Sequence, residues 1–282
     1  MNPGSIICIC GAGTMGSGIA QAAASSGFYT LLYELNDYVL DKAKTSIEKN
    51  LQLLVEKRKI TGNAKEETLN NLHFTNNLHD CLGDVIIEAI IEKPETKIAL
   101  FNKLAGINHN ETVFASNTSS LSITKIAKEV KNPERVIGMH FFNPATIMKL
   151  VEVVKTEFAN ERTTNIIIEL AKQMNKTPVL CKDSPGFIVN RVARPYYIES
   201  LRLVEETIGD FITIDSLMES TGFKMGPFKL MDLIGNDINY AVSCSVFEQL
   251  GNPERLKPSI IQKEKVGSGL LGKKTGKGYY DY

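Results

Sequence analysis

The stretch that decides the fold reads IICICGAGTMGSG and spans residues 6–18. Residues 6–10 are a short apolar run of the kind that forms a strand buried on both faces of a sheet. A G-x-G-x-x-G spacing follows at once, and residues 19–24 continue as an alanine-rich helix that should stop near Gly27. A strand, a glycine-rich turn and a helix in this order indicate a dinucleotide-binding unit.

The glycine-rich turn predicts where the phosphates of a dinucleotide bind. The first glycine permits a tight turn, the second lets a pyrophosphate approach the backbone, and the third lets helix and strand pack closely. The N–H groups and the positive dipole at the start of the helix then hold the phosphates. We therefore expect cofactor contacts from five residues of this turn, namely Gly11, Gly13, Thr14, Met15 and Gly16.

A carboxylate follows the second predicted strand, residues 30–33. Glu34 lies 18 residues beyond Gly16, close to the roughly 20 residues expected for the side chain that binds the adenosine ribose. Its negative charge would repel a 2′-phosphate, and residues 35–39 contain no arginine to neutralise one. These features predict NAD as the cofactor. The alternative is a glycine-rich turn followed by an unrelated surface acid.

Composition narrows the class of protein. The chain has 282 residues, 43% of them hydrophobic, and equal numbers of basic and acidic side chains, 32 of each. A net charge of zero argues against nucleic acid or a membrane surface as a partner held by overall charge. We find no apolar run near the roughly 20 residues that span a bilayer, and no signal-peptide pattern at the start. We therefore expect a cytoplasmic protein.

The cysteines do not suggest disulfides. They are odd in number and scattered: Cys8, Cys10, Cys81, Cys181 and Cys244. Cys8 and Cys10 could suggest a metal site, but both lie in the buried strand and no further His or Cys cluster completes a ligand set in the sequence. We therefore expect small core residues in a reducing compartment, and no metal.

The order of elements predicts two domains. Strand and helix patterns alternate through residue 182, which is typical of a doubly wound, mostly parallel sheet. Beyond the sequence DSPG at 183–186, only helices are predicted, at 187–207, 212–221 and 238–250. We expect an α/β protein: a Rossmann-like domain over residues 1–184, followed by an all-helical domain over 185–282. A long helix over 36–61, closed by Gly62, is predicted within the first domain.

His140 and Glu152 are the candidate proton carriers. His140 ends a predicted strand, and ligands of open α/β sheets lie beyond the carboxyl ends of strands. Glu152 stands in the middle of an apolar strand, where an unpaired carboxylate is costly to bury. If the two strands pair like a hairpin, His140 is its natural partner and becomes a general base with a fixed tautomer. The alternatives are a structural histidine and a solvent-facing glutamate.

Two further polar residues are candidates for holding substrate oxygens. Ser119 lies in the polar turn SNTSS after a predicted strand, where Ser120 and Ser122 are also available as helix caps. Asn190 lies early in the first helix of the second domain, among Phe187, Ile188 and Val189. Its amide could bind a carbonyl oxygen or lie exposed at the surface.

Taken together, these motifs resemble the 3-hydroxyacyl-CoA dehydrogenase family, of the short-chain or 3-hydroxybutyryl-CoA type. The resemblance covers essentially the whole chain. It rests on GAGTMG at 11–16, ASNTSSLSI at 115–123, GMHFFNPATIMKLVEVV at 138–154, KDSPGFIVNR at 182–191, MGPFKLMD at 225–232 and GKKTGKGYYDY at 272–282. The family transfers hydride between C3 of an acyl-CoA and nicotinamide.

The resemblance implies a role for each candidate. It makes His140 the base with Glu152 as its partner, and it places Ser119 and Asn190 on the substrate oxygens. It implies cofactor contacts from Glu92, Lys97, Asn143 and Lys274, and contacts to CoA from Asn50 and Lys57. It also implies a homodimer joined through the helical domain. This chain differs from the family at two of the candidate positions. Glu34, after the second predicted strand, stands where an aspartate is usual, and Asn50 stands where relatives can have serine.

The leading hypothesis is an NAD-dependent (S)-3-hydroxyacyl-CoA dehydrogenase. One alternative is a dinucleotide-binding structural protein without turnover, which the combination of Ser119, His140, Glu152 and Asn190 argues against. Another is a dehydrogenase of free 3-hydroxy acids, for which the sequence offers no convincing carboxylate anchor. Acyl chain length, a second carboxylate on the acyl group and the direction of the reaction stay open.

Overall fold

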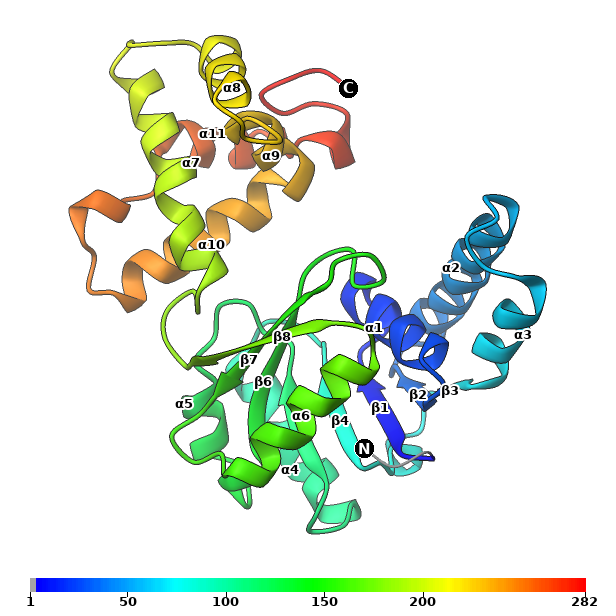
Figure 1. Ribbon diagram of the computed structural model, residues 1–282. Helices are drawn as coiled ribbons and strands as arrows, with labels where there is room; N and C mark the ends of the chain where they lie inside the picture. Colours follow the sequence, from blue (N-terminus) through cyan, green and yellow to red (C-terminus); the bar gives the residue numbers. More distant parts are fainter. Residues whose placement is uncertain (1–3) are drawn as a thin grey trace. The chain divides into compact units, whose positions relative to one another are not determined.

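In the computed structural model, which describes residues 4–282, the chain divides into two compact units (Figure 1). The first ends at Asp183 and carries a mixed sheet, and the second runs over Ser184–Tyr282 and is helical. A Rossmann-like sheet followed by a helical region is the fold class that the sequence predicts, and it is confirmed.

The sheet has eight strands in the order β3-β2-β1-β4-β5-β6-β7-β8. The strands are β1 (Ile6–Cys10), β2 (Tyr29–Tyr33), β3 (Leu72–Thr75), β4 (Val85–Glu88), β5 (Val113–Ser116), β6 (Val136–Phe141), β7 (Leu150–Lys155) and β8 (Thr177–Lys182). Neighbours from β3 to β6 are parallel, β7 is antiparallel to β6, and β8 is parallel to β7. The strand order changes direction beside β1, so that the glycine-rich turn lies at the point where ligands bind in such sheets.

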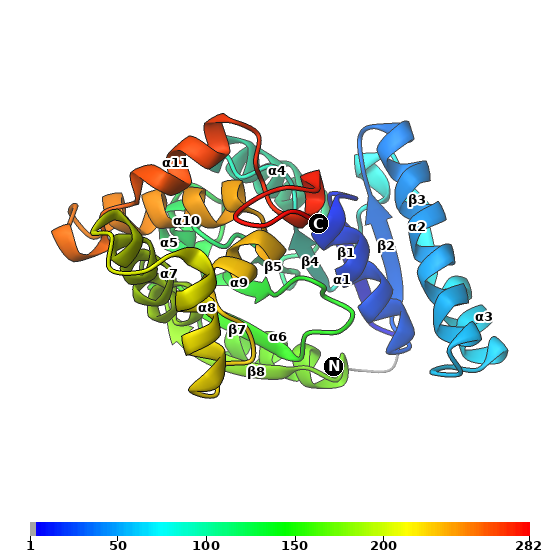
Figure 2. The same ribbon diagram turned by 90° about the horizontal axis from the view of Figure 1, so that it is seen from above.

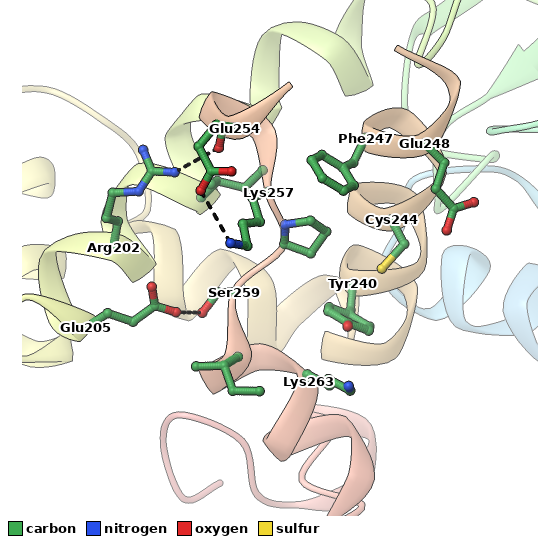
Figure 3. Close-up of a pocket in the computed structure, with 13 residues that line it drawn as sticks. Arg202, Glu205, Tyr240, Cys244, Phe247, Glu248, Glu254, Lys257, Ser259 and Lys263 are labelled. Atoms are coloured by element: carbon green, nitrogen blue, oxygen red, sulfur yellow. Dashed lines mark hydrogen bonds and ion pairs between the residues drawn. The ribbon is translucent and has the colours of Figure 1, made fainter. Parts of the chain in front are cut away.

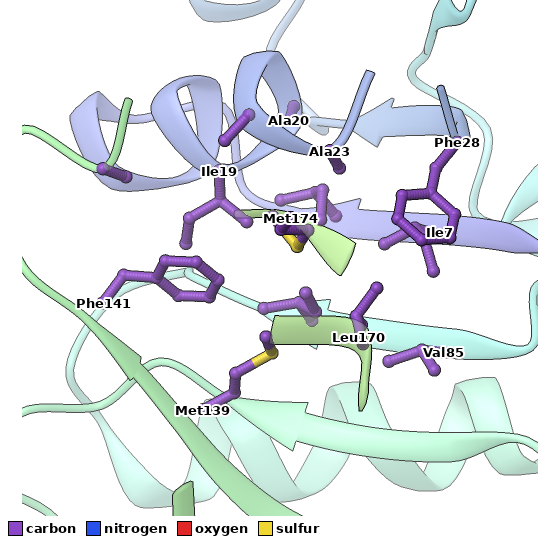
Figure 4. Packing of buried hydrophobic residues seen from close by; sticks show 14 of the residues in the cluster. Ile7, Ile19, Ala20, Ala23, Phe28, Val85, Met139, Phe141, Leu170 and Met174 are labelled. Atoms are coloured by element: carbon purple, nitrogen blue, oxygen red, sulfur yellow. The ribbon is translucent and has the colours of Figure 1, made fainter. Parts of the chain in front are cut away.

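Helices cover both faces of this sheet. They are α1 (Thr14–Ser25), α2 (Asp37–Glu56), α3 (Gly62–Asn70), η1 (Leu78–Asp80), α4 (Pro94–Ile107), α5 (Ile123–Lys128), η2 (Pro133–Arg135) and α6 (Glu161–Gln173). Helices α1 and α6 share one apolar core with the sheet, as Figure 4 shows for Ile19, Met139 and Leu170. Helices α4 and α5 pack on the other face, where the ring of Phe101 lies 5.5 Å from that of Phe114. Helices α2 and α3 lie side by side at the β3 end of the sheet (Figure 2).

The alternation of side chains along β1 sorts its residues between the two faces. Ile7 and Ile9 belong to the core that contains α1, so Cys8 and Cys10 point to the opposite face. All four side chains are fully buried. A run of consecutive apolar residues is therefore what this central parallel strand requires.

The sequence misplaces one helix boundary. Helix α2 ends at Glu56 instead of continuing to Thr61, because Arg58 takes a left-handed conformation with φ 54°. Thr61 is the N-cap of the next helix, and its hydroxyl accepts from the backbone N–H of Ala64 at 3.2 Å. Gly62 thus begins a helix and does not close one.

The second unit is a bundle of short helices. They are α7 (Val189–Glu205), α8 (Phe211–Ser220), α9 (Pro227–Ile234), α10 (Asn236–Gln249), η3 (Glu254–Leu256), α11 (Ile260–Gly267) and η4 (Lys273–Thr275). The sequence patterns do not predict α9 and α11. The last residues of the chain pack on this bundle, since the backbone N–H groups of Tyr279 and Tyr280 both donate to buried Asp232 at 3.0 Å. Over residues 4–282, every helix is too short or too polar to cross a bilayer.

Candidate functional site

The glycine-rich turn is built so that only glycine fits at two positions. Gly11 has φ +104°, and a Cβ there would lie 2.7 Å from the carbonyl oxygen of Ala89. A Cβ on Gly16 would lie 1.7 Å from the carbonyl oxygen of Gly11. These contacts hold the start of α1 tightly against the end of β1.

Gly13 differs from these two glycines, because an added Cβ would meet nothing within 4 Å. It is the N-cap of α1, and within the described part of the chain no side chain caps this helix and no acid lies in its first turn. An open approach to an uncapped helix N-terminus suits an anion. These residues therefore fit the pyrophosphate of a dinucleotide such as NAD.

Glu34 connects the end of β2 to this turn. One carboxylate oxygen accepts from the backbone N–H of Ala12 at 3.0 Å, and the other accepts from that of Asn36 at 3.2 Å. The side chain is half-buried. A negative charge is thereby fixed next to the glycine-rich turn, where the sequence predicts a ribose contact.

His140 and Glu152 face each other across two strands. They are register partners in the antiparallel pair β6–β7, and 2.8 Å separates His140 Nδ1 from Glu152 Oε2. His140 is 5% exposed and Glu152 is fully buried. The pairing that the sequence predicts is confirmed. The connection between the strands is short, so an antiparallel pair brings the two residues together.

This geometry fixes the tautomer of the imidazole. When Glu152 is ionised, its carboxylate only accepts hydrogen bonds, and the tautomer that fits this contact has the proton on Nδ1, which donates to Glu152. The other ring nitrogen, Nε2, then presents a lone pair and can accept a proton. When it does, the buried carboxylate lies next to the new positive charge and stabilises it.

The polar turn after β5 is tied to the strand that ends near His140. The side-chain oxygen of Asn117 accepts from the backbone N–H of Phe141 at 2.9 Å. Ser122 is the N-cap of α5, where its hydroxyl accepts from the N–H of Lys125. Helix capping therefore does not account for Ser119, which lies between these two contacts in the turn.

A buried ion pair, which sequence reasoning missed, lies at the end of β4. Glu88 is fully buried, and its carboxylate pairs with the ammonium of Lys97, which is 1% exposed. The hydroxyl of Ser116 and the backbone N–H of Ile90 also donate to it, at 2.7 and 2.8 Å. Burial raises the pKa of Glu88, although Lys97 and these hydrogen bonds oppose the rise.

Glu92 extends this network to the polar turn. It lies 3.2 Å from the Lys97 ammonium, and it accepts from the hydroxyls of Thr118 and Ser120 and from the backbone N–H of Ser119. Burial acts to raise the pKa of Glu92, but the charge of Lys97 and the hydrogen bonds outweigh it, so the pKa is lowered. Lys97 and Glu92 thus support the turn that carries Ser119.

The remaining predicted residues lie in several places. Asn50 is exposed on α2, and Lys57 is exposed at the end of the same helix. Asn143 precedes Pro144 through a cis peptide bond in the segment after β6. Two candidates belong to the second unit: Asn190 at the start of α7, and Lys274, whose ammonium lies 2.6 and 2.7 Å from the carboxylate oxygens of Asp237.

The second unit contains a cavity of about 620 Å³ (Figure 3). Among its charged side chains, Lys257 lies 3.4 Å from Glu254, and Arg202 donates to the backbone carbonyl of Glu254 at 3.3 Å. The side chains that line it include no histidine. The cavity therefore lacks the proton carrier that the β6–β7 pair provides.

The fold brings a third cysteine, Cys81, beside Cys8 and Cys10, which the sequence patterns do not predict. The Sγ atoms of Cys8, Cys10 and Cys81 lie within 4.8 Å of one another, and all three residues are fully buried. Cys81 is 71 residues from Cys10 in the sequence, so the spacing gave no sign that it completes a cluster. The hydrogen bonds that Cys81 receives from Cys10 and Cys8 lower its pKa to about 5.

Family comparisons cover both units. The model described as "3-hydroxyacyl-CoA dehydrogenase, NAD binding domain" matches residues 6–184, and the model of the C-terminal domain of the same family matches residues 186–282.

Individual relatives match over nearly the whole chain. An Escherichia coli K12 protein named 3-hydroxyadipyl-CoA dehydrogenase is 46% identical over 278 residues, which are 98% of this chain but 58% of that protein. A Deinococcus radiodurans protein named "Probable 3-hydroxybutyryl-CoA dehydrogenase" is 40% identical over 97% of this chain and 99% of its own length. Mycobacterium tuberculosis FadB2 is 33% identical in sequence to this chain. Its crystal structure superimposes on this structure with a TM-score of 0.96, and the match covers 100% of both chains.

Proposed function

Because this chain belongs to the 3-hydroxyacyl-CoA dehydrogenase family, we propose that it catalyses the reversible, NAD-dependent oxidation of (S)-3-hydroxyacyl-CoA to 3-oxoacyl-CoA. The observation that carries the proposal is the His140–Glu152 pair, at 2.8 Å, in the domain that matches the NAD-binding model. A general base of fixed tautomer at the carboxyl end of a strand is what oxidation of a secondary alcohol requires.

His140 is the residue that moves the proton. Its Nε2 accepts the proton of the 3-hydroxyl group as the C3–H bond breaks, and it returns the proton in the reverse direction. Glu152 stabilises the imidazolium that forms, because its charge is buried 2.8 Å from Nδ1. General-base catalysis of this type contributes a factor of about 10²–10⁴ in rate.

The glycine-rich turn binds and orients the cofactor. Bound NAD supplies the hydride acceptor. The uncapped start of α1 beside Gly13 holds the pyrophosphate, and Glu34 accepts hydrogen bonds from the adenosine ribose hydroxyls. Glu92 and Lys97 keep the polar turn in place, and Asn143 and Lys274 complete the proposed cofactor contacts.

The substrate is held through its oxygens and its phosphates. Ser119 and Asn190 are proposed as the residues that bind the substrate oxygens, an assignment that rests on their motifs. Lys57 is exposed and positively charged, as a contact for a CoA phosphate should be, and Asn50 lies near it on the same helix. We assign 3-hydroxybutyryl-CoA as the substrate, and a cytoplasmic homodimer joined through the helical unit as the assembly.

The test is a substrate panel with NADH. We expect oxidation of NADH with 3-oxoacyl-CoA thioesters, with the highest kcat/KM for acetoacetyl-CoA, and little activity with free 3-oxo acids or with NADPH. A panel that includes 3-oxoadipyl-CoA separates a butyryl substrate from a dicarboxylate substrate. Tight NADH binding without turnover of any thioester would favour the non-catalytic alternative and overturn the proposal.

A further inference from the structure

The three clustered cysteines lie outside the proposed reaction. Cys8 and Cys10 belong to β1, and Cys81 follows η1, just before β4. Their Sγ atoms lie within 4.8 Å of one another, and each residue has an exposed fraction of 0%. They lie on the face of the sheet opposite to the α1 core, since Ile7 and Ile9 occupy that core.

The spacing of the sulfurs suits a single metal ion. Metal–thiolate bonds are about 2.3 Å long, so three sulfurs around one ion are about 4 Å apart. Sulfur atoms already within 4.8 Å of one another need only small side-chain rotations to reach that geometry. The cluster contains three sulfur ligands and no histidine or carboxylate, which favours a soft ion.

The number of ligands and the burial select among soft ions. Structural zinc almost always takes four ligands, and here the fourth would have to come from a group outside the cluster or from water reaching a fully buried site. Cu(I) is bound by thiolates and is satisfied by three of them. We propose that Cys8, Cys10 and Cys81 form a binding site for one soft monovalent ion of the Cu(I) type.

The fold provides a way for the ion to enter. Cys81 lies on a short irregular segment between η1 and β4, and its neighbour Leu82 is 50% exposed. The next residue, Gly83, lies directly against Cys8, because a Cβ on Gly83 would be 3.5 Å from the Cβ of Cys8. Local opening of this segment uncovers the sulfurs while β1 stays within the sheet.

An occupied site should stabilise the sheet unit. The ion would join central strand β1 to the segment before β4, and a ligand that binds the folded state raises the free energy of unfolding. The site lies next to the glycine-rich turn but uses none of the residues that we assign to the reaction. Its test therefore does not depend on the proposed function.

The experiment is an anaerobic titration of the fully reduced protein with Cu(I), in competition with a colorimetric Cu(I) chelator. The probe variants are Cys81→Ser and, as an independent substitution, Cys8→Ala. The matched control is the double variant Cys181→Ser/Cys244→Ser, which leaves the cluster intact and removes the remaining cysteines. Circular dichroism checks the fold of each variant, and thermal unfolding is followed with and without the ion.

We expect one equivalent of Cu(I) in the wild type and in the double control, with a higher Tm on binding. Each probe variant should lose more than about tenfold in affinity, because removing a ligand costs at least as much as removing a group that supports one. Three results would overturn the proposal: no binding against the chelator, unchanged affinity in folded Cys81→Ser and Cys8→Ala, or loss of binding in the double control.

Discussion

Two buried carboxylates of the sheet unit differ in the kind of cation they face. Glu88, at the end of β4, pairs with the ammonium of buried Lys97. Glu152, in β7, faces His140, whose charge depends on whether it holds a second proton. Both carboxylates are fully buried. Burying a negative charge is costly in both places. The Glu88 pair stabilises the scaffold, whereas the Glu152 pair supports the proposed proton transfer.

Removing His140, the partner of Glu152, should have the largest effect. We expect His140→Gln to lower kcat by about 10²–10⁴-fold, because no group remains at Nε2 to take the proton, while NADH binding persists. Steady-state reduction of acetoacetyl-CoA measures the loss, and fluorescence titration measures NADH binding. Exposed His109→Gln is the matched control. A kcat above a tenth of the wild-type value would exclude His140 as the base.

Removing Lys97, the partner of Glu88, should affect folding first. Lys97→Met leaves Glu88 buried without its charge partner, and breaking a buried pair from one side costs about 3–5 kcal/mol. Urea unfolding measures the loss, with exposed Lys103→Met on the same helix as control. The double variant Lys97→Met/Glu88→Gln should recover part of the stability. Equal stability of the two lysine variants would show that the Glu88 pair contributes nothing.

A third carboxylate, that of half-exposed Glu34, should contribute to the preference for NADH over NADPH. Glu34→Gln keeps the size of the side chain and one of its two accepting oxygens, but removes the charge that repels a 2′-phosphate. We expect the preference of kcat/KM for NADH over NADPH to fall about tenfold, which corresponds to about 1.4 kcal/mol. Asp41→Asn, an exposed change on α2, is the control and should leave the ratio unaltered. A wild-type protein that uses both cofactors equally would contradict the assignment of Glu34.

The smallest effect is expected at Glu92, which is 40% exposed. Its pKa is lowered in the folded state, so its contribution to stability is complete above the unfolded-state pKa and is lost as the pH falls through the folded-state pKa. Glu92→Gln should therefore cost at most about 1 kcal/mol at neutral pH, a difference that shrinks in acid. Urea unfolding at several pH values, with Glu48→Gln as control, measures it. A difference that grew in acid would contradict this sign.

The sequence predicted the parts of the molecule that depend on local patterns. The β1 turn and the His140–Glu152 pair could be found because glycine spacing is a local signal, and because a glutamate in an apolar strand needs a partner close along the chain. The Lys97–Glu88 pair could not be predicted, because Lys97 resembles any lysine near the start of a helix. Its burial becomes visible only once the sheet is known. Cys81 was missed for the same reason, and α9 and α11 because each has eight residues.

The central claim is that His140 and Glu152 act as one unit, and a double-mutant cycle in kcat tests it most directly. Glu152→Gln alone should lower kcat by at least about 100-fold, since the amide removes the charge that stabilises imidazolium and can favour the wrong tautomer. If the two residues work together, the double variant His140→Gln/Glu152→Gln loses no more than His140→Gln alone, with folding and NADH binding retained. If the fold-losses in kcat of the two single variants multiply in the folded double variant, the residues act independently, and this result would contradict the account.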